Sequence, residues 1–328
     1  MKLTKIANQL NEDISKYDNF LILPHVMADG DAVGCCIAMA RYIKSRGKKA
    51  LMVMEEKVPY IYSFMENSCD IEIYTPAKTY NYDICIAIDT GDIKRLGKRK
   101  ILFENHISYN IDHHKTNDGY AVYNYVNEDV SSSGEIVYEI FQKMKASLDH
   151  DIAQALYVAI ATDTGGFRYQ NTNKKSFIIS ARLMDYELNI EKISEWVFER
   201  TNMNKLHLFE NTIQNIRFHC NNRVAVSTLR TSEYMHLDVT DEDFEGLVNI
   251  VKNIEGVEIG IFLRERPDKK EVKGSLRSNT DNVDVSLIAK AHGGGGHARA
   301  AGLISSKSID AVYTGIIRSL NEVYKCTE

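Results

Sequence analysis

Over residues 1–187, short runs of hydrophobic residues alternate with longer segments in which hydrophobic residues recur at helical spacing. Runs of about five apolar residues predict β-strands, whereas the recurring pattern predicts amphipathic helices. Strands are predicted at residues 19–23, 49–54, 71–74, 83–88, 107–111 and 122–126. Helices are predicted at 4–16, at 31–46 and after Ser131, where Ser132 and Glu135 have the spacing of a capping box. This alternation predicts an α/β domain with a mostly parallel sheet and helices on both of its faces.

The pattern changes in the second half of the chain. Residues 174–217 are almost wholly helical in pattern and contain neither glycine nor proline. We therefore predict a first domain at 1–189, a helical connector at 190–213 and a smaller α+β domain at 214–328. In this last part, strands are predicted at 223–229, 257–263 and 272–276, and helices at 241–253, 284–292 and 309–325. The glycine run at 293–296 is predicted to be a loop.

Composition narrows the classes of function. A chain of 328 residues with 44% hydrophobic residues is long enough for two cores. Its net charge of −5 argues against a long nucleic-acid track, which requires many Lys and Arg contacts to phosphates, and favours short or small phosphorylated substrates. The six cysteines show no C-x-x-C spacing, which favours reduced thiols. No export segment or membrane span is recognisable, so we expect a cytoplasmic protein.

Ionisable residues follow four of the apolar runs. They are His25, Asp29 and Asp31 after 20–23, Asp89 after 84–88, Asp112, His113 and His114 after 107–111, and Asp163 after the run 156–162, which we also interpret as a strand. Strand ends at one edge of a sheet gather their side chains in one crevice. Nitrogen and oxygen ligands without thiolates suit hard or borderline divalent cations. The sequence therefore predicts a two-metal hydrolase, in which Asp89 could bridge the two cations.

The chain resembles the DHH phosphoesterases, in particular the branch that carries a DHH-associated C-terminal domain, and within it the bacterial nanoRNase/pAp phosphatase group. The matching segments are 25–34, 88–92, 112–114, 162–169 and 293–302. The resemblance implies that His25, Asp29 and Asp89 hold one metal ion. It further implies that Asp31, Asp89, His113 and Asp163 hold a second, with Mn²⁺ the usual metal and Mg²⁺ or Co²⁺ as substitutes.

Two residues near these ligands, His114 and Arg168, have two interpretations each. His114 either contacts the phosphoryl group or helps the leaving group depart, or it only orients a neighbouring carboxylate. Asp112 is expected to hold a histidine ring. Arg168 either reaches a substrate phosphate or forms a surface ion pair. We leave residues 131–133 out of the site, because helix capping alone explains them.

In the second domain, the resemblance implies that the glycine run grips one end of a nucleotide substrate. The residues concerned are Gly294, Gly295, Gly296, His297, Arg277 and Ser278. Glycine N–H groups can approach a phosphate without obstruction by side chains. The implied activities are removal of nucleotides from RNA of two to five residues, linear dinucleotides included, and conversion of 3′-phosphoadenosine 5′-phosphate (pAp) to AMP.

Other functions remain as alternatives. A cyclic dinucleotide (c-di-AMP) phosphodiesterase would share both domains and the catalytic residues. A non-catalytic nucleotide-binding or metal-sensing protein would belong to another class, although it predicts a degraded ligand set. An inorganic pyrophosphatase and a long-strand exonuclease fit less well, and the basic stretch 94–100 is interpreted as a solvated loop. A homodimer is compatible with the sequence, but apolar patterning does not reveal its interface.

Overall fold

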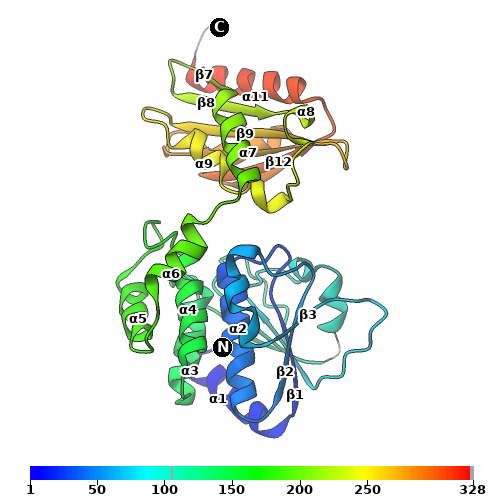
Figure 1. The fold of residues 1–328 in the computed structure, drawn as a ribbon, viewed down its shortest axis with the longest axis vertical. Coiled ribbons are helices and arrows are strands. Elements are labelled where there is room, and N and C mark those ends of the chain that lie inside the picture. Colours follow the sequence, from blue (N-terminus) through cyan, green and yellow to red (C-terminus); the bar gives the residue numbers. More distant parts are fainter. Residues whose placement is uncertain (105, 326–328) are drawn as a thin grey trace. The chain divides into compact units, whose positions relative to one another are not determined.

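The computed structural model describes residues 1–104 and 106–325. The chain forms two compact units, Met1–Arg200 and Thr201–Glu328, each of which is described by itself (Figure 1). The division between them falls inside the predicted connector 190–213. No helix in the described part of the chain is long and apolar enough to cross a membrane.

The first unit contains a sheet of six strands that are all parallel, in the order β3-β2-β1-β4-β5-β6. The strands are β1 (Asn19–Leu23), β2 (Lys49–Met54), β3 (Asp70–Ile73), β4 (Ile84–Ile88), β5 (Ile107–Asp112) and β6 (Tyr123–Val126). The helices are α1 (Leu3–Lys16), α2 (Gly30–Ser45), α3 (Ser133–Met144), α4 (His150–Asp163), α5 (Lys174–Met184) and α6 (Ile190–Ser194). Shorter turns are the 3₁₀ helices η1 (Tyr60–Ser68) and η2 (Ile93–Leu102) and the π-helix η3 (Glu195–Glu199).

This strand order contains one switch point, between β1 and β4. The chain runs outward from β1 to β3 and then returns to β4 before it runs outward to β6. In such sheets the connections after the two central strands leave in opposite directions, which opens a crevice at their carboxyl ends. The predicted strands that precede His25 and Asp89 are these two central strands.

One face of the sheet carries the larger core, formed with α1, α2, α3 and the helices behind them. The opposite face is covered by η2 and tyrosine-rich loops, with Leu96 and Phe103 buried against the sheet. Helix α2 packs closely on α4 because Gly34 has no side chain: an added Cβ would lie 2.3 Å from the carbonyl oxygen of Ala155. The α/β prediction with helical elements on both faces is therefore confirmed.

One predicted element of this unit is wrong. The apolar run 156–162 is the second half of the buried helix α4, and Asp163 is the last helical residue rather than a strand end. Leu156, Val158, Ala159 and Ile160 are all fully buried because neighbouring helices surround α4. A short run that is apolar on every side has no helical stripe, so periodicity cannot distinguish a buried helix from a buried strand.

The second unit is a six-stranded mixed sheet in the order β11-β12-β10-β9-β8-β7, with only the β8–β9 pair parallel. The strands are β7 (Ile216–His219), β8 (Val224–Leu229), β9 (Ile259–Arg266), β10 (Glu271–Ser278), β11 (Gly294–His297) and β12 (Ala300–Ser305). The helices are α7 (Met203–Gln214), α8 (Thr231–Tyr234), η4 (Asp241–Phe244), α9 (Leu247–Lys252), α10 (Val285–Ala291) and α11 (Ile309–Tyr324). Helices α10 and α11 cover one face of the sheet, and α7 and α9 lie on the other.

The prediction that the glycine run forms a loop is wrong. Gly294 to His297 form the edge strand β11, paired antiparallel with β12. The close pairing explains the glycines, because an added Cβ at Gly294 would lie 2.0 Å from the carbonyl oxygen of Gly302. Gly295, by contrast, faces open space. Glycine runs lack the side-chain pattern from which strands are predicted, so the pairing became visible only in three dimensions.

Candidate metal centre

A first group of candidate ligands lies at the switch point between β1 and β4. The Nε2 atom of His25 is 3.6 Å from Asp29 Oδ2 and 3.6 Å from Asp89 Oδ2. His25 and Asp89 are buried, whereas the Asp29 side chain is 57% exposed. Asp29 also caps helix α2, since its Oδ1 accepts hydrogen bonds from the backbone N–H groups of Asp31 and Ala32. Capping and ligation are therefore compatible in this residue.

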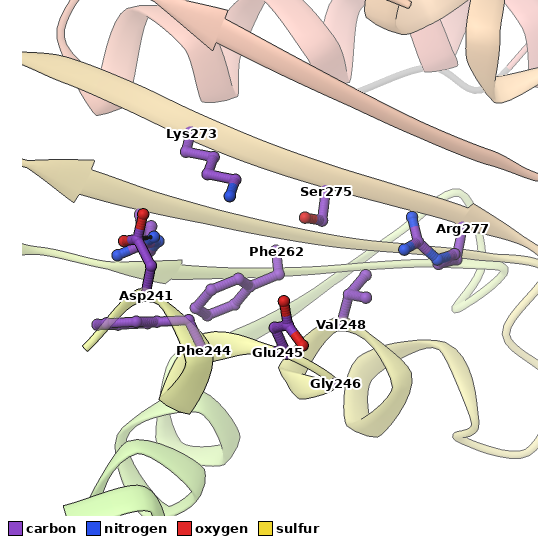
Figure 2. Close-up of a pocket in the computed structure, with 10 residues that line it drawn as sticks. Asp241, Phe244, Glu245, Gly246, Val248, Phe262, Lys273, Ser275 and Arg277 are labelled. Carbon is purple, nitrogen blue, oxygen red and sulfur yellow. Dashed lines mark hydrogen bonds and ion pairs between the residues drawn. The ribbon is translucent and has the colours of Figure 1, made fainter. Parts of the chain in front are cut away.

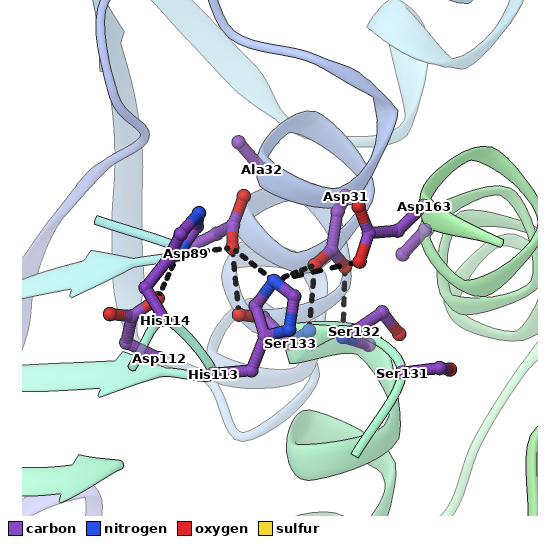
Figure 3. Close-up of polar contacts among 12 residues, drawn as sticks. Asp31, Ala32, Asp89, Asp112, His113, His114, Ser131, Ser132, Ser133 and Asp163 are labelled. Carbon is purple, nitrogen blue, oxygen red and sulfur yellow. Dashed lines mark hydrogen bonds and ion pairs between the residues drawn. The ribbon is translucent and has the colours of Figure 1, made fainter. Parts of the chain in front are cut away.

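A second group adjoins the first through Asp89. The Nε2 atom of His113 lies 3.5 Å from Asp89 Oδ1, 3.5 Å from Asp163 Oδ2 and 3.9 Å from Asp31 Oδ2. Figure 3 shows the His113 ring between Asp89 on one side and Asp31 and Asp163 on the other. These side chains come from the ends of β4, β5 and α4 and from the first turn of α2. Among the six predicted ligands, His25, Asp29 and Asp89 form one group that could hold a cation, and Asp31, His113 and Asp163 form another. Asp89 lies 3.5 Å from His113 of the second group, and these two residues form a further possible group with His114.

The amino end of helix α3 holds the Asp31 carboxylate. Both of its oxygens accept backbone hydrogen bonds, from Ser133 N at 2.6 Å and from Gly134 N at 2.9 Å. Free N–H groups at a helix start and the helix dipole both favour a negative charge there. In addition, the Ser133 hydroxyl donates to Asp89 Oδ1 at 3.0 Å. Ser133 therefore orients a candidate ligand of each group, although we left it out of the site on the sequence alone.

Burial and repulsion between neighbouring carboxylates shift several pKa values in the site. Burial raises the pKa of Asp31 well above its usual value, and the carboxylates of Asp89 and Asp163 add to this effect. Burial and the same Asp89 carboxylate raise the pKa of Asp163 to about 8. Burial alone would lower the pKa of His25, but its contacts with Asp29 and Asp89 outweigh burial and raise it to about 9. Burial lowers the pKa of His113.

The donor set fits divalent cations. It consists of four carboxylates and two imidazoles, without thiolates, and such oxygen and nitrogen ligands suit hard and borderline metals. Buried carboxylates that repel one another are stable in their charged form only when a cation compensates them. The described cluster contains no Lys or Arg in an ion pair with Asp31, Asp89 or Asp163. A bound divalent cation is therefore the simplest source of the missing positive charge.

The backbone geometry of Asp89 is unusual. Its φ of 57° places a non-glycine residue in the left-handed region, where Asp and Asn are the side chains best tolerated. Its backbone N–H donates to the carbonyl of Ile111 at 2.9 Å, which holds the turn against β5. Backbone strain of this kind is concentrated at functional sites. With this backbone conformation, the Asp89 carboxylate lies 3.6 Å from Nε2 of His25 and 3.5 Å from Nε2 of His113.

Arg95 was not predicted, because it lies in the basic stretch 94–100 that we interpreted as a solvated loop. Its Nη2 atom is 3.0 Å from Nδ1 of His25, and that same Nδ1 is 2.7 Å from the carbonyl oxygen of Val26. When Nδ1 carries the proton and donates it to Val26, Nε2 is left with a free lone pair toward Asp29 and Asp89, as metal ligation requires. The basic stretch thus places a cationic side chain beside the site.

A dyad of Asp112 and His114 borders the cluster. The Nδ1 atom of His114 lies 2.8 Å from Asp112 Oδ1 and 3.6 Å from Asp89 Oδ1. The Asp112 side chain is fully buried, and its second oxygen accepts a hydrogen bond from the Asn117 amide at 2.6 Å. The hydrogen bond to Asp112 raises the pKa of His114, whose side chain is 34% exposed. Asp112 thus holds a histidine ring, and Nε2 of that ring remains available to a ligand.

The other predicted residues lie outside this cluster. Arg168 is exposed; its Nε donates to the carbonyl of Gly165, and it lines a separate cavity with Phe167 and Phe198. Arg277 and the glycines of β11 belong to the second unit, where they line one groove. Ser278 is buried, and its hydroxyl donates to the carbonyl of Thr280 at 2.7 Å. The serine that lines the groove beside Arg277 is Ser275.

The chain is similar to known proteins over most of its length. The chain is 26% identical over 306 residues to the bifunctional oligoribonuclease and PAP phosphatase NrnA of Thermus thermophilus, across 92% of this chain and 89% of the relative. It is 25% identical over 304 residues to the protein of the same name from Bacillus subtilis, across 90% and 92%. Its fold matches the crystal structure of an exopolyphosphatase-related protein from Bacteroides fragilis with a TM-score of 0.88 and 23% identity, over 98% of this chain and 97% of that one.

Family models account for both units. Residues 19–160 match the N-terminal domain of the DHH family, and residues 221–323 match the DHHA1 domain. The first match contains the ends of β1, β4 and β5, which carry most of the candidate ligands. The second contains β10 and the glycine strand β11. The chain therefore consists of a DHH family N-terminal domain followed by a DHHA1 domain.

Proposed function

We propose that the protein is a metal-dependent phosphoesterase that hydrolyses short oligoribonucleotides to mononucleotides and pAp to AMP. The observation that carries this proposal is the pair of ligand groups that share Asp89 at the switch point of the sheet. The names of the Thermus thermophilus and Bacillus subtilis relatives supply the substrate class. The net charge of −5 agrees with short substrates rather than with a protein surface that binds a long nucleic acid through many phosphate contacts.

We infer that His25, Asp29 and Asp89 hold one divalent cation and that Asp31, Asp89, His113 and Asp163 hold another, with Mn²⁺ as the expected metal. Two such ions, when bound, lower the pKa of a water molecule and neutralise charge on a phosphoryl group. The amino end of α3 and the Ser133 hydroxyl keep Asp31 and Asp89 oriented for this role. Mg²⁺ and Co²⁺ are chemically compatible substitutes.

In this proposal, His114 is the residue that handles the substrate. Asp112 accepts a hydrogen bond from Nδ1–H of His114, which fixes the ring orientation and leaves Nε2 for a ligand. From that position His114 can hydrogen-bond a phosphoryl oxygen or donate a proton to the leaving oxygen. Asp112 acts through His114 and is a positioning residue.

Substrate recognition is assigned to the groove of the second unit. A cavity of about 470 Å³ is lined by Arg277, Ser275, Gly295, Gly296 and Ala300, among others. Arg277 supplies charge for a phosphate, and the glycine strand lets a ligand approach its backbone without a side chain in the way. His297 ends the same strand and is exposed. We leave Ser278 out of the proposed site, because it is buried on the other face.

An assay panel tests the proposal. The full-length protein is incubated with Mn²⁺ and pAp, pApA, pGpG, an RNA pentamer, cyclic di-AMP or pyrophosphate, and kcat/KM is compared. We expect pAp and the linear dinucleotides to be the best substrates, and Asp89→Asn to abolish turnover. Asp70→Asn is the matched control. Asp70 is an exposed carboxylate that pairs with Lys44, and it lies at the start of β3, whereas the candidate ligands follow the carboxyl ends of the strands.

The outcomes separate the alternatives. Turnover of cyclic di-AMP or pyrophosphate alone would show that the substrate assignment is wrong. Binding of nucleotides without any hydrolysis would favour the non-catalytic interpretation.

A further inference from the structure

A second cavity lies on the same face of the DHHA1 sheet, between the sheet and the segment that contains η4 and α9. It has a volume of about 360 Å³, and none of the predicted site residues except Arg277 lines it. Figure 2 shows Lys273, Ser275 and Arg277 projecting from the sheet toward Phe262 and α9. Lys273 lines both this cavity and the glycine groove, and none of the roles proposed above is assigned to it.

Cationic side chains are in excess on the sheet side of this cavity. Lys273 on β10 is paired in register with Arg264 on β9, which places like charges directly opposite each other. Asp241 pairs with Arg264 and also with Arg266 at 2.9 Å, while Arg266 has a second partner in Glu271 at 2.8 Å. Among the side chains that the structure describes, Lys273 has no hydrogen bond or ion pair. Partial burial lowers the pKa of Lys273, and the nearby Arg264 adds to this effect.

Phe244, Phe262 and Val248 form the apolar part of a mostly polar cavity lining. Phe262 and Phe244 are buried, with 4% and 8% of their surface exposed, so only a small part of each ring is accessible. The Arg264 guanidinium lies 3.9 Å from the centre of the Phe244 ring, which keeps this ring in a fixed place. The accessible part of these rings lies in the same cavity as an ammonium group that has no hydrogen bond or ion pair among the described side chains, which suits a ligand with an aromatic ring and a negative charge, such as a nucleoside phosphate.

The cavity and the glycine groove share three lining residues. Lys273, Ser275 and Arg277 line both, because alternate residues of β10 point to the same face of the sheet. Four strand residues span roughly 13 Å, so the two hollows lie side by side along one strand. A ligand bound in the groove can therefore extend across β10 into the cavity.

We propose that this cavity is a second nucleotide subsite, in which Lys273 binds a phosphate and Phe244 and Phe262 contact a base of the same oligonucleotide that occupies the glycine groove. This inference rests on the proposed function and adds to it tighter equilibrium binding of oligonucleotides of three or more nucleotides; it leaves the expected ranking of kcat/KM unchanged, because ground-state binding by itself does not raise turnover. Asp241 and Glu245 on the helical side of the cavity limit where a phosphate can lie, which places it near β10.

Equilibrium binding tests the subsite. Oligoadenylates of two, three and five nucleotides are titrated calorimetrically into the full-length protein in EDTA, where the substrate is not cut. For the wild type we expect about tenfold tighter binding of the trimer than of the dimer. Lys273→Met should remove this gain, with dimer affinity changed less than about twofold, and Phe244→Leu should act in the same direction. Lys290→Met is the matched control, because this exposed lysine lies on α10 at the other face.

Salt dependence gives a readout that a purely structural role would not change. Loss of one phosphate contact to a single strand should reduce the slope of log K against log salt concentration by about 0.7. This change is expected for Lys273→Met with the pentamer and not with the dimer.

Equal affinity of wild type and Lys273→Met for all three lengths would overturn the subsite while the proposed function stands. An equal loss for the dimer and the trimer would also overturn it, since Lys273 would then serve the glycine groove alone. Absence of any oligonucleotide binding by the wild type would instead refute the proposed function and the subsite with it.

Discussion

The Nδ1 atom of His114 lies 2.8 Å from the buried Oδ1 of Asp112, while Oδ2 of the same carboxylate accepts a hydrogen bond from Asn117. Both oxygens of Asp112 therefore face donors. An asparagine at this position would place its NH₂ group against one of them in either orientation. The Asp112–His114 pair is thus specific for a carboxylate.

We expect Asp112→Asn to lower kcat about 10- to 100-fold with a small change in KM, because the ring of His114 loses its fixed orientation while the substrate groove is untouched. Steady-state kinetics with pApA and Mn²⁺ measure this, and thermal unfolding reports the integrity of the fold. A kcat within twofold of wild type would show that His114 does not need Asp112.

Removal of metal should change how stability depends on pH. The folded-state pKa of Asp163, about 8, lies above its ordinary value, so folding favours the protonated carboxyl and stability falls as pH rises toward 8. The pKa of His25 is raised to about 9, so its contribution is complete below about pH 6.5 and is lost as pH rises through 9. Both effects have the same sign, and the metal-free protein should lose stability between about pH 5 and 9.

Mn²⁺ should reverse this trend, because deprotonated ligands bind it more tightly as pH rises. Tm is measured by calorimetry in EDTA and in Mn²⁺ across the pH range. Asp163→Asn should flatten the metal-free profile. Parallel profiles with and without Mn²⁺ would contradict the assignment of these residues as ligands.

Two adjacent serines at the start of α3 should have separable effects. Ser133→Ala removes the hydroxyl that holds Asp89 but keeps the N–H that holds Asp31, so we expect about tenfold weaker Mn²⁺ binding. Ser132→Ala removes the helix cap to Glu135 N and should cost about 1 kcal/mol of stability with Mn²⁺ affinity unchanged. Calorimetric titration and denaturant unfolding of both variants give the comparison. Equal Mn²⁺ affinities in the two variants would remove Ser133 from the site.

The glycine strand offers a matched pair in the second unit. A side chain at Gly295 meets no atom within 4 Å, so Gly295→Val should fold normally but fill the groove and raise KM for pApA about tenfold. A Cβ at Gly294 would clash with the backbone of Gly302, so Gly294→Ala should instead lower Tm. Unchanged KM in a folded Gly295→Val protein would exclude the groove as the substrate site.

Much of the candidate site was predictable because its ligands follow short apolar runs. A run such as 84–88 has the length and composition of a buried strand, and an ionisable residue directly after it must lie at the strand end. The structure brings His25, Asp29, Asp31, Asp89, His113 and Asp163 together. Asp163 reaches this place from a helix rather than a strand, which the uniformly apolar run before it could not reveal.

Local sequence determined which elements form in much of this protein and which of them end in a candidate metal-ligating side chain, because hydrophobic periodicity and capping act over a few residues. Tertiary structure alone decided that the N–H groups of Ser133 and Gly134 hold Asp31, that Arg95 lies beside His25 and that the glycine run becomes an edge strand. It also decided that Lys273 of β10 lies directly opposite Arg264 of the adjacent strand β9. These contacts join residues far apart in the chain, and their geometry depends on strand order and helix packing, which no local pattern encodes.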